Sequence, residues 1–289
     1  MFKKKKDQTY QSYWSISWNI FKKNKVAMVC LFIVILLCLI PLFAPLIAPY
    51  DPNKQVLTDR LMKPCGQHWF GTDDLGRDIF SRIIYGCRVS LSVGIISQII
   101  ATVIGYTMGV CAGYYGGKVD SVISFLIQVF SSFPFLLFAM AIMFVLGPGL
   151  INLYLALGLL GWASTARLIR GDVMRLKKME YIDACKVSGG NSFRIIMKHL
   201  LPNCLSTLIV TVTLGIPNAI MSEASLSFLG LGVKAPMASW GSMISFSQPY
   251  IRSATYYSVI PGLAIIITVL AFNMLGDGLR DALDPKLRS

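Results

Sequence analysis

Long stretches without a charged side chain dominate this sequence and restrict what it can fold into. A helix rises 1.5 Å per residue, so about 20 apolar residues cross the roughly 30 Å hydrocarbon layer of a bilayer. The stretch at 121–166 is too long for one crossing and contains Gly147-Pro148-Gly149, which predicts a hairpin of two helices. Four further stretches each predict one helix: residues 26–50, 89–117, 203–230 and 253–276. The sequence therefore predicts six membrane-spanning helices.

The composition excludes the main alternatives. Hydrophobic residues make up 55% of the chain and charged residues 14%, whereas a soluble domain carries about 25% charged residues. A soluble protein of this length needs a polar shell that this chain lacks. The apolar stretches are continuous rather than alternating, which argues against a membrane β-barrel. The predicted fold class is an all-α membrane protein.

The basic residues predict the orientation in the membrane. If the N-terminus is cytoplasmic, 19 of the 27 Lys and Arg residues fall in cytoplasmic segments, as the positive-inside rule requires. We therefore expect a multi-pass protein of the cell membrane with both termini cytoplasmic, and no nucleic-acid site behind the net charge of +13. The predicted segments are a basic cytoplasmic segment 1–25, a first transmembrane helix 26–48, an extracytoplasmic loop 49–88 and a cytoplasmic tail 281–289.

Few residues in the chain could carry out chemistry. There is no G-x-x-x-x-G-K-[ST] phosphate-binding loop, H-E-x-x-H or G-x-S-x-G, so the chain is not expected to bind ATP through a P-loop or to be an enzyme. His68 and His199 are its only histidines, too few for a His-based metal cage. Glu223 interrupts an apolar stretch, and an intramembrane carboxylate is a functional candidate. We favour a structural role in which Glu223 lies near the outer interface, within reach of water or a basic neighbour, and makes a hydrogen bond or ion pair.

Prolines and glycines mark bends and close contacts within the predicted helices. Pro134 and Pro217 fall in the middle of predicted spans, and the kinks they introduce suit either a pathway that opens and closes or a rigid bundle. A pattern of small residues in the second span predicts close helix packing: Gly94, Gly105, Gly109 and Gly113.

The segment 170–202 is polar and amphipathic, unlike its neighbours. Gly189-Gly190 divides it into two predicted helices, with Asn191 or Ser192 as the second N-cap. Helical spacing places two apolar groups, one on each helix: Met179, Ile182 and Val187, then Phe193, Ile196 and Leu200. Such a helix-turn-helix fits a groove in another protein or lies flat on anionic lipid. Its composition does not separate these two interpretations.

This segment resembles the cytoplasmic loop signature of ABC importer permeases, Glu-Ala-Ala-x3-Gly-x9-Ile-x-Leu-Pro. The matching residues are Asp183-Ala184-Cys185, Gly189 and Leu201-Pro202; Asp183, Cys185 and His199 replace the Glu, second Ala and Ile of the signature. Four further blocks resemble the C-type permeases of dipeptide, oligopeptide and nickel importers: residues 70–91, 223–232, 239–241 and 273–285.

The resemblance implies a permease core of five helices at 89–280, preceded by one extra helix, with a coupling loop at 170–202. It implies that the contact with the ATPase involves Glu180, Asp183, Ala184, Cys185, Gly189, His199, Leu201 and Pro202. The implied partners are a second homologous permease in a heterodimer, two cytoplasmic ATPase subunits that use ATP and Mg²⁺, and an extracytoplasmic substrate-binding protein. The chain itself is expected to bind no cofactor, and membrane lipid surrounds it.

The expected cargo is a dipeptide or oligopeptide, and two alternatives stay open. One is nickel or a metal chelate carried by the same family, because cargo recognition belongs mostly to the binding protein. The other is a secondary peptide transporter, which would need intramembrane ionisable residues for ion coupling. Glu223 is the one such residue in the predicted spans.

Overall fold

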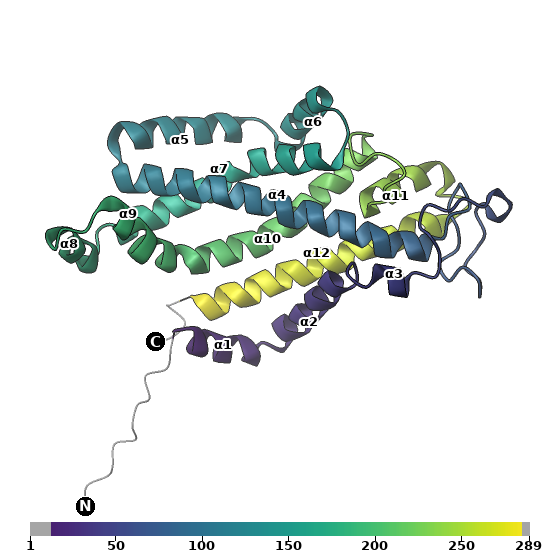
Figure 1. Cartoon of the computed structure of the whole chain (residues 1–289), viewed down its shortest axis with the longest axis horizontal. Coiled ribbons are helices and arrows are strands. Elements are labelled where there is room, and N and C mark those ends of the chain that lie inside the picture. Colours follow the sequence, from purple (N-terminus) through teal and green to yellow (C-terminus); the bar gives the residue numbers. More distant parts are fainter. Residues whose placement is uncertain (1–12, 285–289) are drawn as a thin grey trace, which may run out of the picture.

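The computed structural model describes residues 13–284, which form an elongated helical bundle without a β-strand in this range (Figure 1). The start of the predicted segment 1–25 and the end of the predicted tail 281–289 lie outside the described residues. Helix α8 (Glu180–Val187) marks one end of the bundle and α3 (Ala44–Ile47) lies toward the other; we call these the α8 end and the α3 end. The first described helix begins and the last one finishes at the α8 end (Figure 1).

Twelve α-helices account for most of the described chain. The remaining ones are α1 (Tyr13–Lys23), α2 (Lys25–Leu39), α4 (Ile79–Tyr115), α5 (Gly117–Ser132), α6 (Phe135–Leu146), α7 (Leu150–Leu176), α9 (Ser192–Ile195), α10 (Leu201–Phe228), α11 (Trp240–Ser247) and α12 (Thr255–Leu283). Three short turns join them: η1 (Leu57–Asp59), the π-helical turn η2 (Ile196–Leu200) and η3 (Gln248–Tyr250).

Three helices are long and apolar enough to cross a membrane alone. They are α4, α12 and the continuous segment Ser192–Phe228, which joins α9, η2 and α10. The pair α5 and α6 adds a fourth span if its two halves count as one crossing. Helix α2 is apolar but has only 15 residues.

The expected first helix at 26–48 is not one helix. Helix α2 ends at Leu39, and a turn separates it from the short helix α3. Pro41 lies in that turn, and proline both lacks the amide that a helix interior needs and clashes with the preceding turn. The apolar run therefore continues past the point where the helix stops.

The expected outer loop 49–88 is shorter than predicted because α4 begins at Ile79. Asp78 caps this helix, since its side chain accepts a hydrogen bond from the Ser81 amide. Arg82 and Arg88 thus lie on the helix rather than in the loop. At the other end of the predicted core, α12 continues past residue 280 to Leu283.

Pro134 separates two helices instead of kinking one. Helix α5 ends at Ser132, α6 begins at Phe135, and the two are bent by 90°. The predicted break at Gly147-Pro148-Gly149 is confirmed, because α6 ends before it and α7 begins after it. Pro217, in contrast, lies inside the continuous helix α10.

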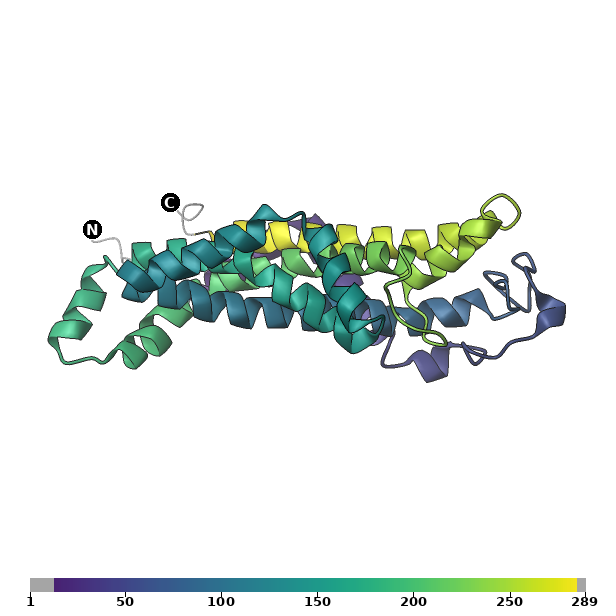
Figure 2. The ribbon, with the colours of Figure 1, turned by 90° about the horizontal axis from the view of Figure 1, so that it is seen from above.

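Helices α4 and α7 lie side by side in both views of the bundle (Figures 1 and 2). Their glycines permit this close approach, as the small-residue pattern predicts. A Cβ added at Gly109 would lie 2.7 Å from the Ala166 carbonyl oxygen and 2.9 Å from Ile169 Cβ. Gly113 faces the Arg170 carbonyl oxygen in the same way, at 2.9 Å.

Replacing Gly109 by valine is expected to separate α4 from α7 and to lower the yield of folded protein. The atoms that meet the new side chain are backbone and Cβ atoms, which cannot move aside, and overpacking of this kind costs about 1–3 kcal/mol or more. Thermal unfolding in detergent measures the loss. Gly171→Ala is the matched control, because a Cβ there meets no atom within 4 Å. Equal stability of the two variants would contradict this packing.

Candidate coupling projection and pathway groove

The segment between α7 and α10 folds into a compact projection at the α8 end, which we call the α8–α9 projection (residues 177–200). Gly189 ends α8 in a left-handed conformation with φ of +79°. The Gly190 amide donates to the Cys185 carbonyl at 2.9 Å and the Gly189 amide donates to the Lys186 carbonyl at 3.0 Å, which is the Schellman pattern of a helix C-terminus. Asn191 then caps α9, because its side chain accepts from the Arg194 amide. The predicted turn and N-cap are therefore confirmed.

The projection has its own apolar anchor on the bundle. Ile182, Ile195 and Leu200 are fully buried and pack with Ile169 and Val173 of α7. The side chain of Lys177 also donates to the Tyr114 carbonyl oxygen of α4 at 2.5 Å. These contacts fix the projection to two long helices, so a force applied to it reaches both of them.

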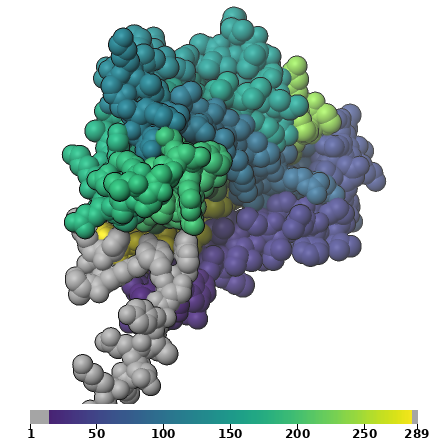
Figure 3. All heavy atoms as spheres, turned by 60° about the vertical axis from the view of Figure 1, so that its left-hand side comes forward, coloured from purple at the N-terminus to yellow at the C-terminus, as the bar shows by residue number. Residues whose placement is uncertain are grey.

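Its outer surface exposes apolar side chains beside the turn. Val187 is 90% exposed and Phe193 is 72% exposed. The predicted stripes are therefore wrong in part: Ile182 and Leu200 point inward, whereas Val187 and Phe193 point outward. Figure 3 brings this end of the molecule forward, and the green atoms of the projection form part of its surface. Exposed apolar side chains beside a turn favour contact with another protein.

The predicted coupling residues divide between the surface and the base of the projection. Glu180, Asp183 and Ala184 are exposed, Asp183 pairing with Lys186 at 2.8 Å. Three half-buried residues and one exposed residue lie at the base: Cys185, His199 and Leu201, and exposed Pro202. The ring centroid of His199 is 6.0 Å from that of Tyr181. Partial burial raises the pKa of the Tyr181 phenol above its ordinary value.

Leu201-Pro202 begins α10. Pro202 lies in the first turn of α10, directly after the π-helical turn η2. The π-helical turn η2 joins α9 to α10 without a break. The projection and the long helix α10 are therefore one continuous helical segment.

A groove of about 1530 Å³ runs along α10 from its first turn to Ser225. Helices α4 and α7 supply the other wall, including Gln98 and Ser164, and Phe135 of α6 also lines the groove. Charged residues line the groove only at the α8 end, where they are Arg175, Arg280 and Asp284. A long groove with a polar wall inside an apolar bundle can pass a hydrophilic molecule.

Glu223 lies near the end of α10 that is farther from α8, does not line the groove and is fully buried. Its Oε1 accepts hydrogen bonds from Ser227 at 2.6 Å and from Ser239 at 2.7 Å. Its Oε2 has no hydrogen-bond partner among the described residues, and a Cβ added at Gly241 would lie 3.1 Å from it. The predicted internal hydrogen bond is present, and among the described residues no basic side chain pairs with Glu223.

Ser239 links Glu223 to the short helix α11. It caps α11 in a capping box with Ser242, and the next residue, Trp240, donates its amide to Ser90 of α4 at 3.1 Å. The Glu223 carboxylate thus lies close to the first turn of α11, where the helix dipole favours a negative group. Glu223 therefore joins α10 to α11.

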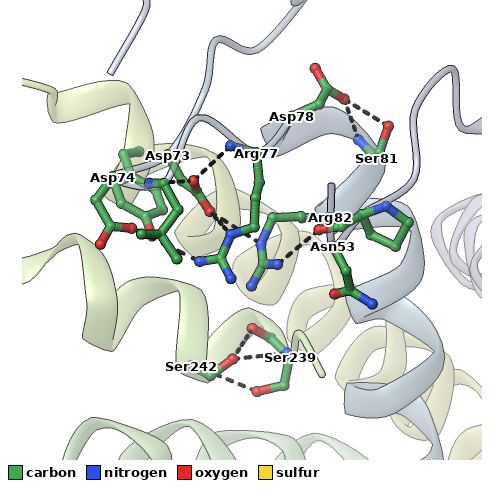
Figure 4. Close-up of polar contacts among 12 residues, drawn as sticks. Asn53, Asp73, Asp74, Arg77, Asp78, Ser81, Arg82, Ser239 and Ser242 are labelled. Atoms are coloured by element: carbon green, nitrogen blue, oxygen red, sulfur yellow. Dashed lines mark hydrogen bonds and ion pairs between the residues drawn. The ribbon is translucent and has the colours of Figure 1, made fainter. Parts of the chain in front are cut away.

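A buried network of charged side chains holds the segment before α4 in place. The search for charge-free stretches could not predict this network. Asp73 accepts from the Arg77 Nε at 2.6 Å and lies 3.5 Å from the Arg82 Nε, and Arg82 also donates to the Pro52 carbonyl at 2.9 Å (Figure 4). Asp74 accepts from the hydroxyl of Tyr257 on α12. These pairs bind the loop at the α3 end to α4 and α12.

His68 belongs to the same region. Its Nδ1 lies 2.9 Å from Asp78 Oδ1, and its ring packs against Tyr50. The described residues contain no group of three or more His, Cys, Asp or Glu side chains placed to hold a metal ion. His68 is thus a packing residue with a carboxylate partner. The sequence pattern does not distinguish Gly190 from its neighbour Gly189, yet a Cβ at Gly190 would lie 2.6 Å from the Cys185 Sγ.

Comparisons with known proteins agree with this arrangement. The family described as "Binding-protein-dependent transport system inner membrane component" matches residues 101–289, and the "N-terminal TM domain of oligopeptide transport permease C" matches residues 12–64. The dipeptide transport system permease protein DppC of Bacillus subtilis (strain 168) is 46% identical over 96% of this chain and 87% of its own length. The oligopeptide transport system permease protein OppC of the same strain is 42% identical over 96% of this chain and 91% of its own length.

The fold has a counterpart among solved structures. A chain of the inward-facing MetNI methionine ABC transporter superposes with a TM-score of 0.57 at 19% identity, covering 71% of this chain and 98% of that one. This likeness concerns the fold alone. The family matches and the relatives at 42–46% identity show that the chain belongs to the binding-protein-dependent transport system inner membrane component family and is a non-catalytic permease component of an ABC transporter.

Proposed function

We propose that this chain is the permease subunit of an importer that carries dipeptides or oligopeptides across the cell membrane. Relatives named for dipeptide and oligopeptide transport, at 46% and 42% identity over 96% of the chain, carry this proposal. An extracytoplasmic binding protein would deliver the peptide to the α3 end. The groove along α10 would form this subunit's half of the pathway, facing a second, homologous permease.

The proposed topology has six crossings with both termini in the cytoplasm. The crossings are α2, α4, the bent pair α5–α6, α7, α10 and α12. The α8–α9 projection and the described chain ends lie at the same end of the bundle, which supports a common cytoplasmic side. Residues 49–78 would then face outward, and the basic surplus would lie inside.

Thiol labelling in sealed vesicles of known orientation tests this sidedness. In a background without reactive native cysteines, a membrane-impermeant reagent applied from outside should label Asn53→Cys but not Met179→Cys. Both native side chains are exposed in the protein, so opening the membrane should make both thiols reactive. Labelling of position 179 from outside a sealed membrane would reverse the topology.

Two ATPase subunits would dock on the α8–α9 projection and supply the energy from ATP and Mg²⁺. The support is the exposed pair Val187 and Phe193 on an element that is anchored to α4 and α7. Closure of the ATPases would push the projection and reorient the bundle between outward-open and inward-open states. This chain would bind no nucleotide itself.

Reconstitution of the whole complex tests the proposed function. Proteoliposomes that contain both permeases and both ATPases, with binding protein outside, should take up a radiolabelled dipeptide only with ATP and not in the presence of vanadate. Uptake driven by a proton gradient without ATPase would favour a secondary transporter. Uptake of Ni²⁺ or a nickel chelate, with no peptide uptake, would favour the metal alternative.

A further inference from the structure

The side of α10 that lines the groove carries a row of polar side chains. Most follow each other at intervals of three or four residues, which places them on one face of a helix. Their side chains line the groove from one end to the other: Asn203, Ser206, Thr207, Thr211, Asn218, Ser222 and Ser225. From Pro202 to Ser225 this face is about 35 Å long, enough to cross the hydrocarbon layer.

Most of these side chains have already used their hydrogen-bond donors on their own helix. The Asn218 amide donates to the Leu214 carbonyl at 3.1 Å, and Thr211, Ser222 and Ser225 donate to carbonyls four residues back at 2.7–2.9 Å. An amide or hydroxyl that donates inward keeps the lone pairs of its oxygen. The face therefore offers mainly acceptors to whatever occupies the groove, together with the second N–H of the Asn203 and Asn218 amides.

The opposite wall continues the neutral polar lining. Ser97 of α4 lines the groove, is 2% exposed, and has a hydroxyl without a hydrogen-bond partner among the described residues. Its neighbour Gln98 packs its amide against the bare Cα of Gly215 on α10. Among the described lining residues, the middle of the groove contains no charged side chain.

We propose that this acceptor row on α10, which includes the exposed Asn218, selects cargo through the N–H groups of the cargo, and that the neutrality of the row makes the pathway tolerant of cargo charge. This inference rests on the proposed peptide-import function. An extended peptide presents backbone amides and an ammonium group, all of which are donors. Neutral acceptors bind such groups weakly, so a peptide can enter and also leave, as conduction through any pathway requires.

The test introduces a charge of either sign at Asn218 in the complete, reconstituted complex. Uptake of a cationic dipeptide (Lys-Ala) and an anionic one (Glu-Ala) is measured at saturating binding protein, whose affinity for each is determined separately. Two unit charges 4 Å apart in water interact by about 1 kcal/mol, which corresponds to about fivefold. Because the two peptides meet the new charge with opposite signs, Asn218→Lys should lower the Lys-Ala to Glu-Ala uptake ratio by up to about 25-fold. Asn218→Asp should raise the ratio by a similar factor.

Thr107 provides the matched control. It is exposed on α4, donates to its own helix as the α10 residues do, and does not line the groove. Thr107→Lys and Thr107→Asp should leave the uptake ratio unchanged. Asn218→Asp nearly preserves the native shape, so its result stands even if the lysine variant fails to assemble.

Two results would overturn the proposal. If both Asn218 variants change uptake of the two peptides equally, Asn218 only supports the structure; if neither changes the ratio, the cargo does not pass this face. Failure of the proposed function looks different, because the unmodified complex would then transport neither peptide with ATP.

Discussion

Val187→Asp is expected to release the ATPase subunits from the complex while leaving the permease folded. Val187 is 90% exposed and makes almost no contact within its own chain, so its replacement removes little internal packing. Buried apolar residues at the centre of an interface commonly cost 2 kcal/mol or more when lost, and an added charge there lacks a partner. Co-purification with the ATPases should fall at least about tenfold, and stimulation of ATP hydrolysis by loaded binding protein should disappear.

Gly189→Val tests the same proposed contact with the ATPase subunits by changing the backbone of the projection. A left-handed conformation costs a non-glycine residue about 1–2 kcal/mol, and the valine would distort the turn that presents Val187 and Phe193. Val119→Asp is the matched control, because Val119 is an exposed valine in the first turn of α5, outside the projection. Helix α5 begins at the same end of the bundle (Figure 1). Retention of cargo-stimulated ATPases by Val187→Asp and Gly189→Val would make flat contact with lipid the better account of the projection.

Glu223→Leu is expected to abolish transport, whereas Glu223→Gln is expected to preserve it within about twofold. Leucine leaves the buried hydroxyls of Ser227 and Ser239 without an acceptor, at about 1–3 kcal/mol for each, and loosens α11 from α10. Glutamine keeps an oxygen at the same place and can accept from both serines. ATP-driven uptake and thermal unfolding of each variant measure the two effects.

The control for this pair is Ser253→Ala, which removes an exposed hydroxyl that bonds only to a nearby backbone carbonyl. It should change neither stability nor transport. If Glu223→Gln assembles normally but transports nothing, the negative charge itself is required, and the hydrogen-bonding role assigned to Glu223 is wrong.

The sequence predicts the helical class, the break at Gly147-Pro148-Gly149 and the turn at Gly189, because each depends on local composition. It misplaces the start of α4, since a search for charge-free runs stops at Arg88. Arg82 is only 1% exposed, and its position inside the protein depends on Asp73, which folding brings within 3.5 Å. A tertiary ion pair of this kind leaves no trace in a hydropathy pattern.

The sequence pattern also does not predict which side chains of the projection are buried against the bundle and which are exposed. Val187 follows Ile182 by five residues, which corresponds to about 140° around a helix of 3.6 residues per turn. The two side chains therefore cannot share one buried face, and α7 selects Ile182. The partner of Glu223 is a similar case, because Ser239 comes from beyond the end of α10 and meets the carboxylate only through the fold of residues 229–239.

Because α9 passes into α10 without a break, Phe193 and Glu223 lie toward opposite ends of one helical segment, which can act as a lever. The segment Ser192–Phe228 has 37 residues and so measures about 55 Å at 1.5 Å per residue. If it tilts by about 10° around its midpoint, each end travels about 5 Å, in opposite directions. A sideways push beside Phe193 would therefore swing Glu223 the other way without any intervening loop. The π-helical turn at Ile196–Leu200 sets how stiff that lever is, because a π turn is a site where a helix can readjust.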